Sequence, residues 1–185
     1  MANANSEGSY MRFVAVLLTL VACSSLHAEE LALAQQSVLD GRVSLLIPAT
    51  FKPMGEEMLR TKYPSERRPT LVFTNERGTV NIALNHAKGH MPANQLAAFH
   101  VSMEGSFKKL YPSAEWFRSE VRKINGREFF VMELRTPAID TEIRNIMLGT
   151  SLEDRLLLIS FNVTKELEGE WLPTANRIIE SVQVK

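Results

Sequence analysis

The alternation of apolar and polar residues along the chain predicts four β-hairpins, each made of two strand-like runs joined by a turn. Asn125 and Gly126 form the clearest of the turns, because both residue types tolerate positive φ. The hairpins cover residues 38–48, 69–85, 115–137 and 141–163, with turns at Asp40 and Gly41, at Gly78, at Asn125 and Gly126, and at Glu153 and Asp154.

Two of these strands carry a more detailed signal. Val80, Ile82 and Leu84 alternate with polar residues, so their strand is expected to have one buried and one solvated face. Residues 156–159 are apolar without interruption, so they are expected to belong to a central strand that is covered on both faces.

Other segments repeat apolar residues every three or four positions, which is the spacing of an amphipathic helix packed on a sheet. A short helix is expected near residues 55–62, and longer helices over 92–110 and from about 165 to 182. Thr164 is a suitable N-cap for the last helix, in which Pro173 is expected to cause a kink or a fresh start. The two long apolar stripes consist of Leu96, Phe99, Met103, Phe107 and Leu110, and of Leu167, Trp171, Ala175, Ile178 and Val182.

Consecutive hairpins form a mainly antiparallel sheet, and helices are needed to cover its apolar faces. The sequence therefore predicts an α+β fold in which helices and sheet form a sandwich. Residues 38–185 are expected to form this fold as a single domain, and residues 29–37 a spacer without a fold signal.

Residues 11–28 have the features of a bacterial export signal, in which Arg12 precedes an apolar run of about ten residues. That run is too short to span a bilayer, which takes roughly 20 residues. Residues 1–10 are polar and contain Glu7, so we interpret them as an extension upstream of a start at Met11.

Two cleavage sites compete within this leader. Leu20, Val21 and Ala22 precede Cys23 as in a bacterial lipobox, where the cysteine is lipidated and becomes the new N-terminus. Cleavage after Ala28 by ordinary signal peptidase would instead discard the cysteine and release an unanchored protein. The lipobox interpretation makes Cys23 the lipid attachment site.

Both interpretations place the protein in the bacterial periplasm. Lipidation of Cys23 would anchor it firmly to a membrane, because several acyl chains are buried at once. Ser24 stands where an aspartate would favour retention at the inner membrane, so the outer membrane is the expected destination. Cys23 is the only cysteine of the chain, which excludes an internal disulfide.

Composition and charge narrow the range of partners. The 185 residues include 21 basic and 21 acidic ones, so the formal net charge is zero. A nucleic-acid-binding domain needs a basic surface that displaces counterions from phosphates, so no nucleic-acid partner is expected.

The sequence offers one weak candidate for a metal site and no recognisable catalytic set. His86 and His90 stand four residues apart, with His100 ten residues further on. This spacing binds zinc when a helix presents both rings together, but Gly89 and Pro92 predict a loop. We therefore expect no metal site, no cofactor and no enzymatic activity.

Several other charged or aromatic groups have an unremarkable structural interpretation. Carboxylate pairs are expected in surface turns, a small basic patch in a solvated loop, and both tryptophans in the core or at its margin. These groups are Glu56 with Glu57, Glu153 with Asp154, Lys62 with Arg67 and Arg68, and Trp116 and Trp171.

The chain resembles the DcrB-like bacterial envelope lipoproteins, which share the PsbP-type α/β/α sandwich. The resemblance is carried by three segments and by the lipobox at Cys23, and it covers roughly residues 38–184. The segments are VLDGRVSLLIP, IMLGTSLEDRLLLISFNV and ANRIIESVQV. The resemblance implies a PsbP-like fold and a non-enzymatic role in the cell envelope.

The expected function is therefore that of an exported, lipid-anchored accessory protein that acts by binding another envelope protein. One alternative is a periplasmic immunity protein that neutralises a secreted toxin of the type VI system. A second alternative, of another class, is a metal-dependent hydrolase that uses His86, His90 and an acidic residue.

Overall fold

The computed structural model describes residues 31–64 and 68–185, which belong to one compact unit spanning Leu31–Lys185. The expected export signal, the lipobox and Arg67 lie outside the described residues. Within the described part, no helix is long and apolar enough to cross a membrane.

A small antiparallel sheet is formed by the two ends of this unit. It has the order β1-β2-β10, with β1 at Leu33–Val38, β2 at Val43–Pro48 and β10 at Gln183–Val184. The hairpin expected around Asp40 and Gly41 is thus confirmed. Residues 33–37, expected to be part of a spacer, instead form most of β1. The residue pattern does not predict this strand, because its middle residues are polar and exposed. Backbone pairing with β2 holds it in place.

The larger sheet has seven strands in the order β3-β4-β5-β9-β8-β7-β6, and all neighbours are antiparallel. This arrangement confirms the expected α+β class. It also confirms a central position for β9, which contains residues 156–159. The strands are β3 Lys52–Pro53, β4 Leu71–Thr74, β5 Val80–His90, β6 Glu115–Ile124, β7 Arg127–Pro137, β8 Glu142–Leu152 and β9 Arg155–Thr164.

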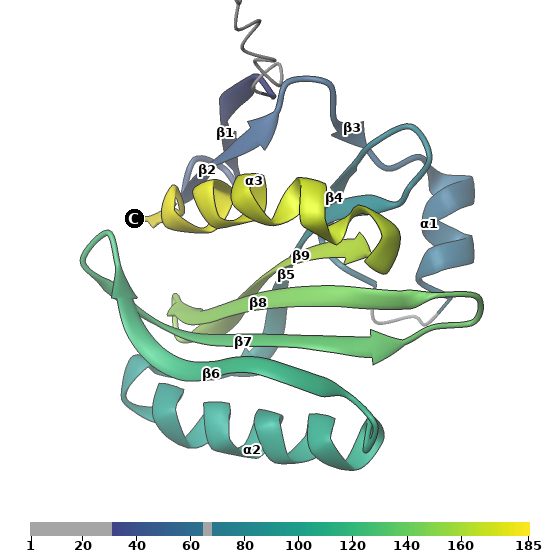
Figure 1. Cartoon of the computed structure of the whole chain (residues 1–185). Helices are drawn as coiled ribbons and strands as arrows, with labels where there is room; N and C mark the ends of the chain where they lie inside the picture. Colours follow the sequence, from purple (N-terminus) through teal and green to yellow (C-terminus); the bar gives the residue numbers. More distant parts are fainter. Residues whose placement is uncertain (1–30, 65–67) are drawn as a thin grey trace, which may run out of the picture. The chain divides into compact units, whose positions relative to one another are not determined.

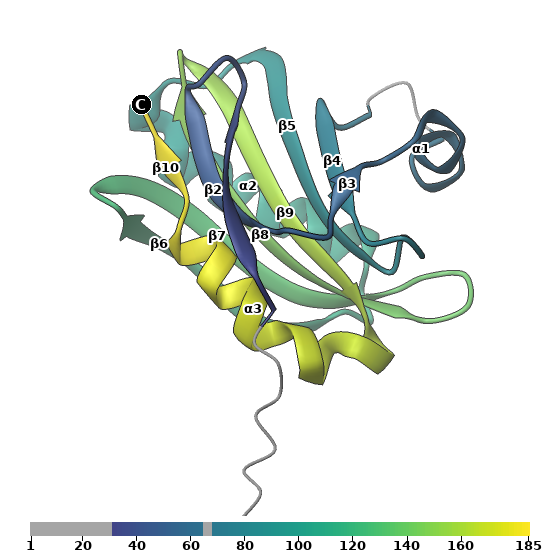
Figure 2. The same cartoon turned by 90° about the horizontal axis from the view of Figure 1, so that it is seen from above.

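Helices cover both faces of the larger sheet (Figure 1). Helix α3, Glu168–Glu180, lies on one face together with the small sheet, and α2, Leu96–Leu110, lies on the opposite face. The short helix α1, Glu56–Lys62, lies beside β4 (Figure 2). Two 3-10 turns, η1 at Ala93–Gln95 and η2 at Lys165–Leu167, lead into α2 and α3.

The two covered faces have separate hydrophobic cores. The core under α3 is the larger one and is built from apolar residues of β2, β5, β7, β8, β9 and α3. The core under α2 is smaller, and its buried members are Met91, Leu96, Phe130, Met132, Leu134 and Met147.

Three details differ from the expectations. The face of β5 opposite Val80 and Ile82 is not solvated, because Ala83 packs with Met54 and Val72 under α1. Leu110, the last residue of α2, is 68% exposed. The buried polar residue His100 instead lies between the other members of that stripe.

The last helix begins differently from the expectation at Thr164 and Pro173. No side-chain hydrogen bond from Thr164 caps it, and the chain first forms η2. Pro173 lies inside α3, which continues past it, so of the two expected alternatives the fresh start is wrong. The change from 3-10 to α-helix occurs at Glu168 instead.

Candidate functional site

Three hairpin turns meet at one end of the unit, which we call the turn end. The side chain of Arg42, after the β1–β2 turn, donates to Glu153 of the β8–β9 turn. The Asn125 amide, in the β6–β7 turn, donates to the carbonyls of Glu180 and Val182 at 2.9 Å each. The C-terminal Lys185 N–H donates to the Arg42 carbonyl at 2.9 Å.

Four residues with side chains adopt the left-handed region in two of these turns. They are Leu39 and Asp40, with φ of 51° and 56°, and Glu153 and Asp154, with φ of 53° and 54°. Such backbone is costly for residues with a Cβ, and it persists only where the surroundings hold it. Arg42 supplies part of that restraint, since its Nε also donates to the Leu39 carbonyl at 2.8 Å.

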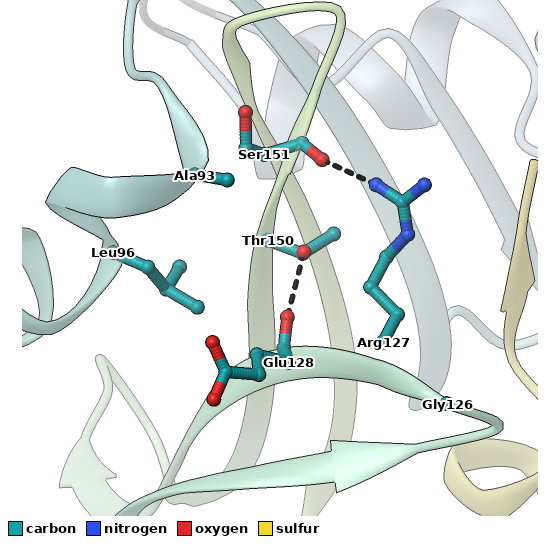
Figure 3. Close-up of a pocket in the computed structure, with 7 residues that line it drawn as sticks. All are labelled: Ala93, Leu96, Gly126, Arg127, Glu128, Thr150 and Ser151. Carbon is teal, nitrogen blue, oxygen red and sulfur yellow. Dashed lines mark hydrogen bonds between the residues drawn. The ribbon is translucent and has the colours of Figure 1, made fainter.

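A cavity of about 280 Å³ opens beside these turns (Figure 3). Its walls come from η1, from the first residue of α2, from the β6–β7 turn, from the start of β7 and from the end of β8. Figure 3 shows the Glu128 carboxylate pointing toward Leu96, with the Arg127 guanidinium on the opposite side next to Ser151. The lining residues are Ala93, Leu96, Gly126, Arg127, Glu128, Thr150 and Ser151.

The hydroxyls of this cavity bond to backbone carbonyls rather than to a base. Thr150 Oγ1 donates to the Glu128 carbonyl and Ser151 Oγ to the Met91 carbonyl, both at 2.8 Å. Arg127 Nη1 donates to the Ser151 carbonyl at 2.7 Å. The seven lining residues therefore contain no activated nucleophile, and their bonds hold the shape of the cavity.

His86 and His90 do not lie in a loop as expected, because both belong to β5, with an irregular register between them. His86 Nε2 lies 3.0 Å from the Leu152 carbonyl, and its Nδ1 lies 3.1 Å from Arg155 Nη2. Arginine can only donate, so Nδ1 accepts and Nε2 carries the hydrogen. Both ring nitrogens of His86 are thus engaged, and the described residues hold no group of three potential metal-binding side chains.

The third histidine belongs to a polar cluster under α2 that sequence analysis missed. His100 is buried, and its Nε2 lies 2.8 Å from Ser119 Oγ in β6. Ser119 Oγ donates to Glu104 at 2.6 Å, and Lys108 donates to the same carboxylate from one helical turn further on. The spacing of His100, Glu104 and Lys108 on one helical face was visible in the sequence, but the approach of Ser119 was not.

This serine, histidine and glutamate do not have the geometry of a catalytic triad. In a triad the acid contacts the ring nitrogen that faces away from the serine, and the serine donates to the histidine. Here Glu104 lies 3.9 Å from Nε2, the nitrogen that also faces Ser119, and the serine donates to the glutamate. Bonds from Lys108 and then Ser119 hold the pKa of Glu104 below its usual value, so this carboxyl is ionised at neutral pH.

A second cluster that the sequence did not reveal lies on the α3 face of β6, β7 and β8. Glu133 and Arg144 are buried there and bonded to each other at 2.7 Å, and Arg118 bonds to the second carboxylate oxygen at 3.1 Å. The Phe117 ring covers Arg144, with its centroid 3.1 Å from the guanidinium carbon. A β-bulge in β6 at Phe117 changes the direction of this side chain, so that its ring lies over the cluster.

The remaining candidate residues have structural positions. Trp171 is buried against Phe51, with ring centroids 5.4 Å apart, and Trp116 is half-buried with Lys108 over its ring. Arg68 donates to the Tyr63 carbonyl at 3.1 Å. The carboxylates of Glu56, Glu57 and Asp154 are exposed.

The layers and sheet order place the protein in the PsbP-like fold class. No family model matches the sequence, and no curated protein matches it either. Among solved structures, the chain is similar to the cyanobacterial PsbP protein CyanoP from Synechocystis sp. PCC 6803. The two are 13% identical, with a TM-score of 0.59 over 90% of this chain and 99% of the other.

Two further solved structures share the fold. LpqN of Mycobacterium tuberculosis, described as involved in cell envelope biogenesis, is 11% identical, with a TM-score of 0.51 over 83% of this chain and 91% of its own. A protein of Bacteroides thetaiotaomicron is 14% identical, with a TM-score of 0.53 over 82% of this chain, and this chain covers 48% of it. At these identities the likeness establishes the PsbP-like fold, while the DcrB-like assignment stays a prediction.

Proposed function

We propose that this protein is an exported, lipid-anchored accessory protein of the bacterial envelope that binds another envelope protein through its turn end. The leader of residues 11–28 supports export, and the lipobox supports lipid attachment at Cys23. LpqN, which has the same fold, is described as acting in cell envelope biogenesis, which is consistent with a role in the envelope.

The main support for this binding surface is the conformation of the β1–β2 and β8–β9 turns. Two turns hold four non-glycine residues at positive φ, and the Arg42–Glu153 ion pair ties these turns together. Strained backbone that its surroundings hold in place tends to occur at functional sites. A surface fixed in this way loses little conformational entropy when a partner binds.

The position of the expected anchor fits this assignment. The Ala49 N–H donates to the Ala32 carbonyl, so the first described residues lie beside the end of β2, whereas β2 begins at the turn end. Figure 2 shows the start of β1 and the β1–β2 turn at opposite ends of the unit. From Cys23 to Leu31 an extended chain spans at most about 29 Å. A lipid at Cys23 would therefore attach the chain at the end opposite to the turn end.

Site-specific photo-crosslinking in intact cells tests this proposal. A photoreactive amino acid at Asp40 or Asp154 is expected to give a covalent adduct with one envelope protein. The matched control is the same amino acid at Glu57, which is exposed on α1 at a distance from the turns. An antibody against the chain should recover the adducts, because a C-terminal tag at Lys185 would crowd the turn end.

The same preparation yields the mature N-terminal peptide by mass spectrometry. An acylated Cys23 supports the anchor, and a free N-terminus after Ala28 overturns that part alone. Equal labelling from Glu57 and from the turns would overturn the binding surface. A single stoichiometric toxin in the adduct would replace the accessory role by the immunity alternative.

A further inference from the structure

Strand β6 is an edge of the larger sheet whose outer side pairs with no other described strand. It is ten residues long, and Figure 2 shows it at the outer margin of the sheet. Unpaired backbone N–H and C=O groups along such an edge can pair with another chain. Two of the exposed large apolar residues of the described part, Phe117 and Val121, lie on this strand, 40% and 41% exposed.

The side chains of β6 are complementary to a second copy of the same strand in one antiparallel register. When Ser119 lies opposite its own copy on a two-fold axis, Arg118 lies opposite Glu120. The β-bulge at Phe117 then brings Trp116 opposite Val121 and Glu115 opposite Arg122. Each of these pairs occurs twice, and each joins opposite charges or two apolar side chains.

The neighbouring symmetric registers lack this complementarity. A two-fold axis at Glu120 would place Glu120 opposite itself, and an axis at Arg118 would place that arginine opposite itself. Like charges directly opposite each other are destabilising in a sheet. An axis at Val121 would place Glu120 opposite Arg122 but Arg118 opposite Ile124, so the register centred on Ser119 has more complementary pairs.

Two arginines of β6 also lack full hydrogen bonding within one chain. The Nε atoms of Arg118 and Arg122 are buried without a hydrogen-bond partner, although each side chain bonds a carboxylate through its terminal nitrogens. Glu120 lies between these two arginines at 4.0 Å and 3.8 Å, too far for a hydrogen bond to either. In the selected register a second copy brings Glu120 and Glu115 to the same two guanidinium groups.

Helix α2 leaves room for such a pair. It packs mainly over β7, and two β7 strands on either side of a β6–β6 seam lie about 14 Å apart. Packed helices need only 8–10 Å between their axes, so the two α2 helices fit beside each other on the same face.

We propose that two copies of the chain pair antiparallel through β6 about a two-fold axis at Ser119, joining their larger sheets into one continuous sheet. The contact is isologous, which is the usual arrangement of homodimers. Its axis lies six residues from Asn125 of the turn end, and the contact does not depend on the envelope role proposed above.

Disulfide trapping tests the register directly. In the full chain with Cys23→Ser, Ser119→Cys is expected to form a covalent dimer on mild oxidation. Opposed residues in antiparallel strands have Cα atoms about 4.5–5.5 Å apart, within reach of a disulfide. The control Val121→Cys should form no covalent dimer on oxidation, because its two copies would lie about 13 Å apart along the strands.

Mass measurements keep the proposal testable if Ser119→Cys fails to fold. The full chain with Cys23→Ser is expected to show a concentration-dependent mass approaching twice that of one chain. Glu120→Arg should weaken the association at least tenfold, since it places an arginine opposite Arg118, and Glu57→Arg on α1 should leave it unchanged. A monomeric mass at high concentration, or equal cross-linking of the two cysteine variants, would overturn the proposal.

Discussion

The α3 face and the α2 face of the larger sheet bury different kinds of side chain. Among the described residues, the core under α3 contains aliphatic and aromatic residues and no methionine. The core under α2 has six buried residues, three of which are methionines, and it adjoins the His100, Glu104 and Ser119 cluster. One face therefore has a large apolar core, and the other a small core bordered by hydrogen-bonded polar groups.

This difference indicates a division of roles between the two faces. Branched aliphatic side chains pack in few rotamers, whereas unbranched methionine adapts to irregular gaps. The α3 face also joins the two sheets, because β2 and α3 contribute to its core. We infer that the α3 face supplies most of the stability and that the α2 face tolerates more rearrangement.

Phe129 and Phe130 offer the sharpest test of this difference, because they are adjacent in β7 and point to opposite faces. Both are fully buried, Phe129 in the core under α3 and Phe130 in the core under α2. Truncation of a buried phenylalanine to alanine costs about 3–5 kcal/mol, less where neighbours can close the cavity. We expect Phe129→Ala to lose about 4–5 kcal/mol and Phe130→Ala about 3 kcal/mol, measured by denaturant unfolding.

The slope of the unfolding curve serves as the control for this pair. If it stays unchanged in both variants, the difference in midpoint reports stability alone. A greater loss from Phe130→Ala than from Phe129→Ala would contradict the view that the methionine-rich core adapts.

A substitution at Gly149 tests the core under α2 by adding volume instead of removing it. A Cβ added there would lie 2.0 Å from the Phe130 ring, closer than any real contact. Gly149→Ala should therefore cost roughly 2–3 kcal/mol through overpacking of the α2 core. In a Phe130→Ala background the ring is gone, and the same substitution should cost less than about 1 kcal/mol. Additive losses in the double variant would show that the glycine is needed for another reason.

Most of the fold followed from residue patterns, and the exceptions have physical causes. The turns at Gly78 and at Asn125 and Gly126 were found because glycine and asparagine tolerate the positive φ that both turns adopt. Strand β1 was missed because its central residues are polar and it depends on pairing with β2. The burial of Ala83 was missed because it depends on α1, which is distant from β5 in the sequence.

The candidate sites were much less predictable. The contact between Arg42 and Glu153 joins residues 111 positions apart, and no local pattern signals it. Phe117 looked like one more apolar residue of a strand, and only the bulge places its ring over Arg144. A glycine in the sequence indicates where left-handed backbone is possible. No such signal marks Leu39, Glu153 and Asp154, which adopt it here.

The smallest expected effect is a pH dependence of the unfolding free energy, caused by Glu104 on the α2 face. Bonds from Lys108 and Ser119 hold the pKa of Glu104 below that of an unfolded chain, which is about 4.3. Its carboxylate therefore stabilises the fold above that pH, and the contribution is lost as the pH falls through the lowered pKa. The difference in unfolding free energy between the wild type and Glu104→Gln should be largest near pH 7 and shrink toward pH 3. Lys108→Met should reduce this difference, because it removes the main cause of the low pKa. A difference that is constant from pH 7 to pH 3 would show that Glu104 acts by packing alone.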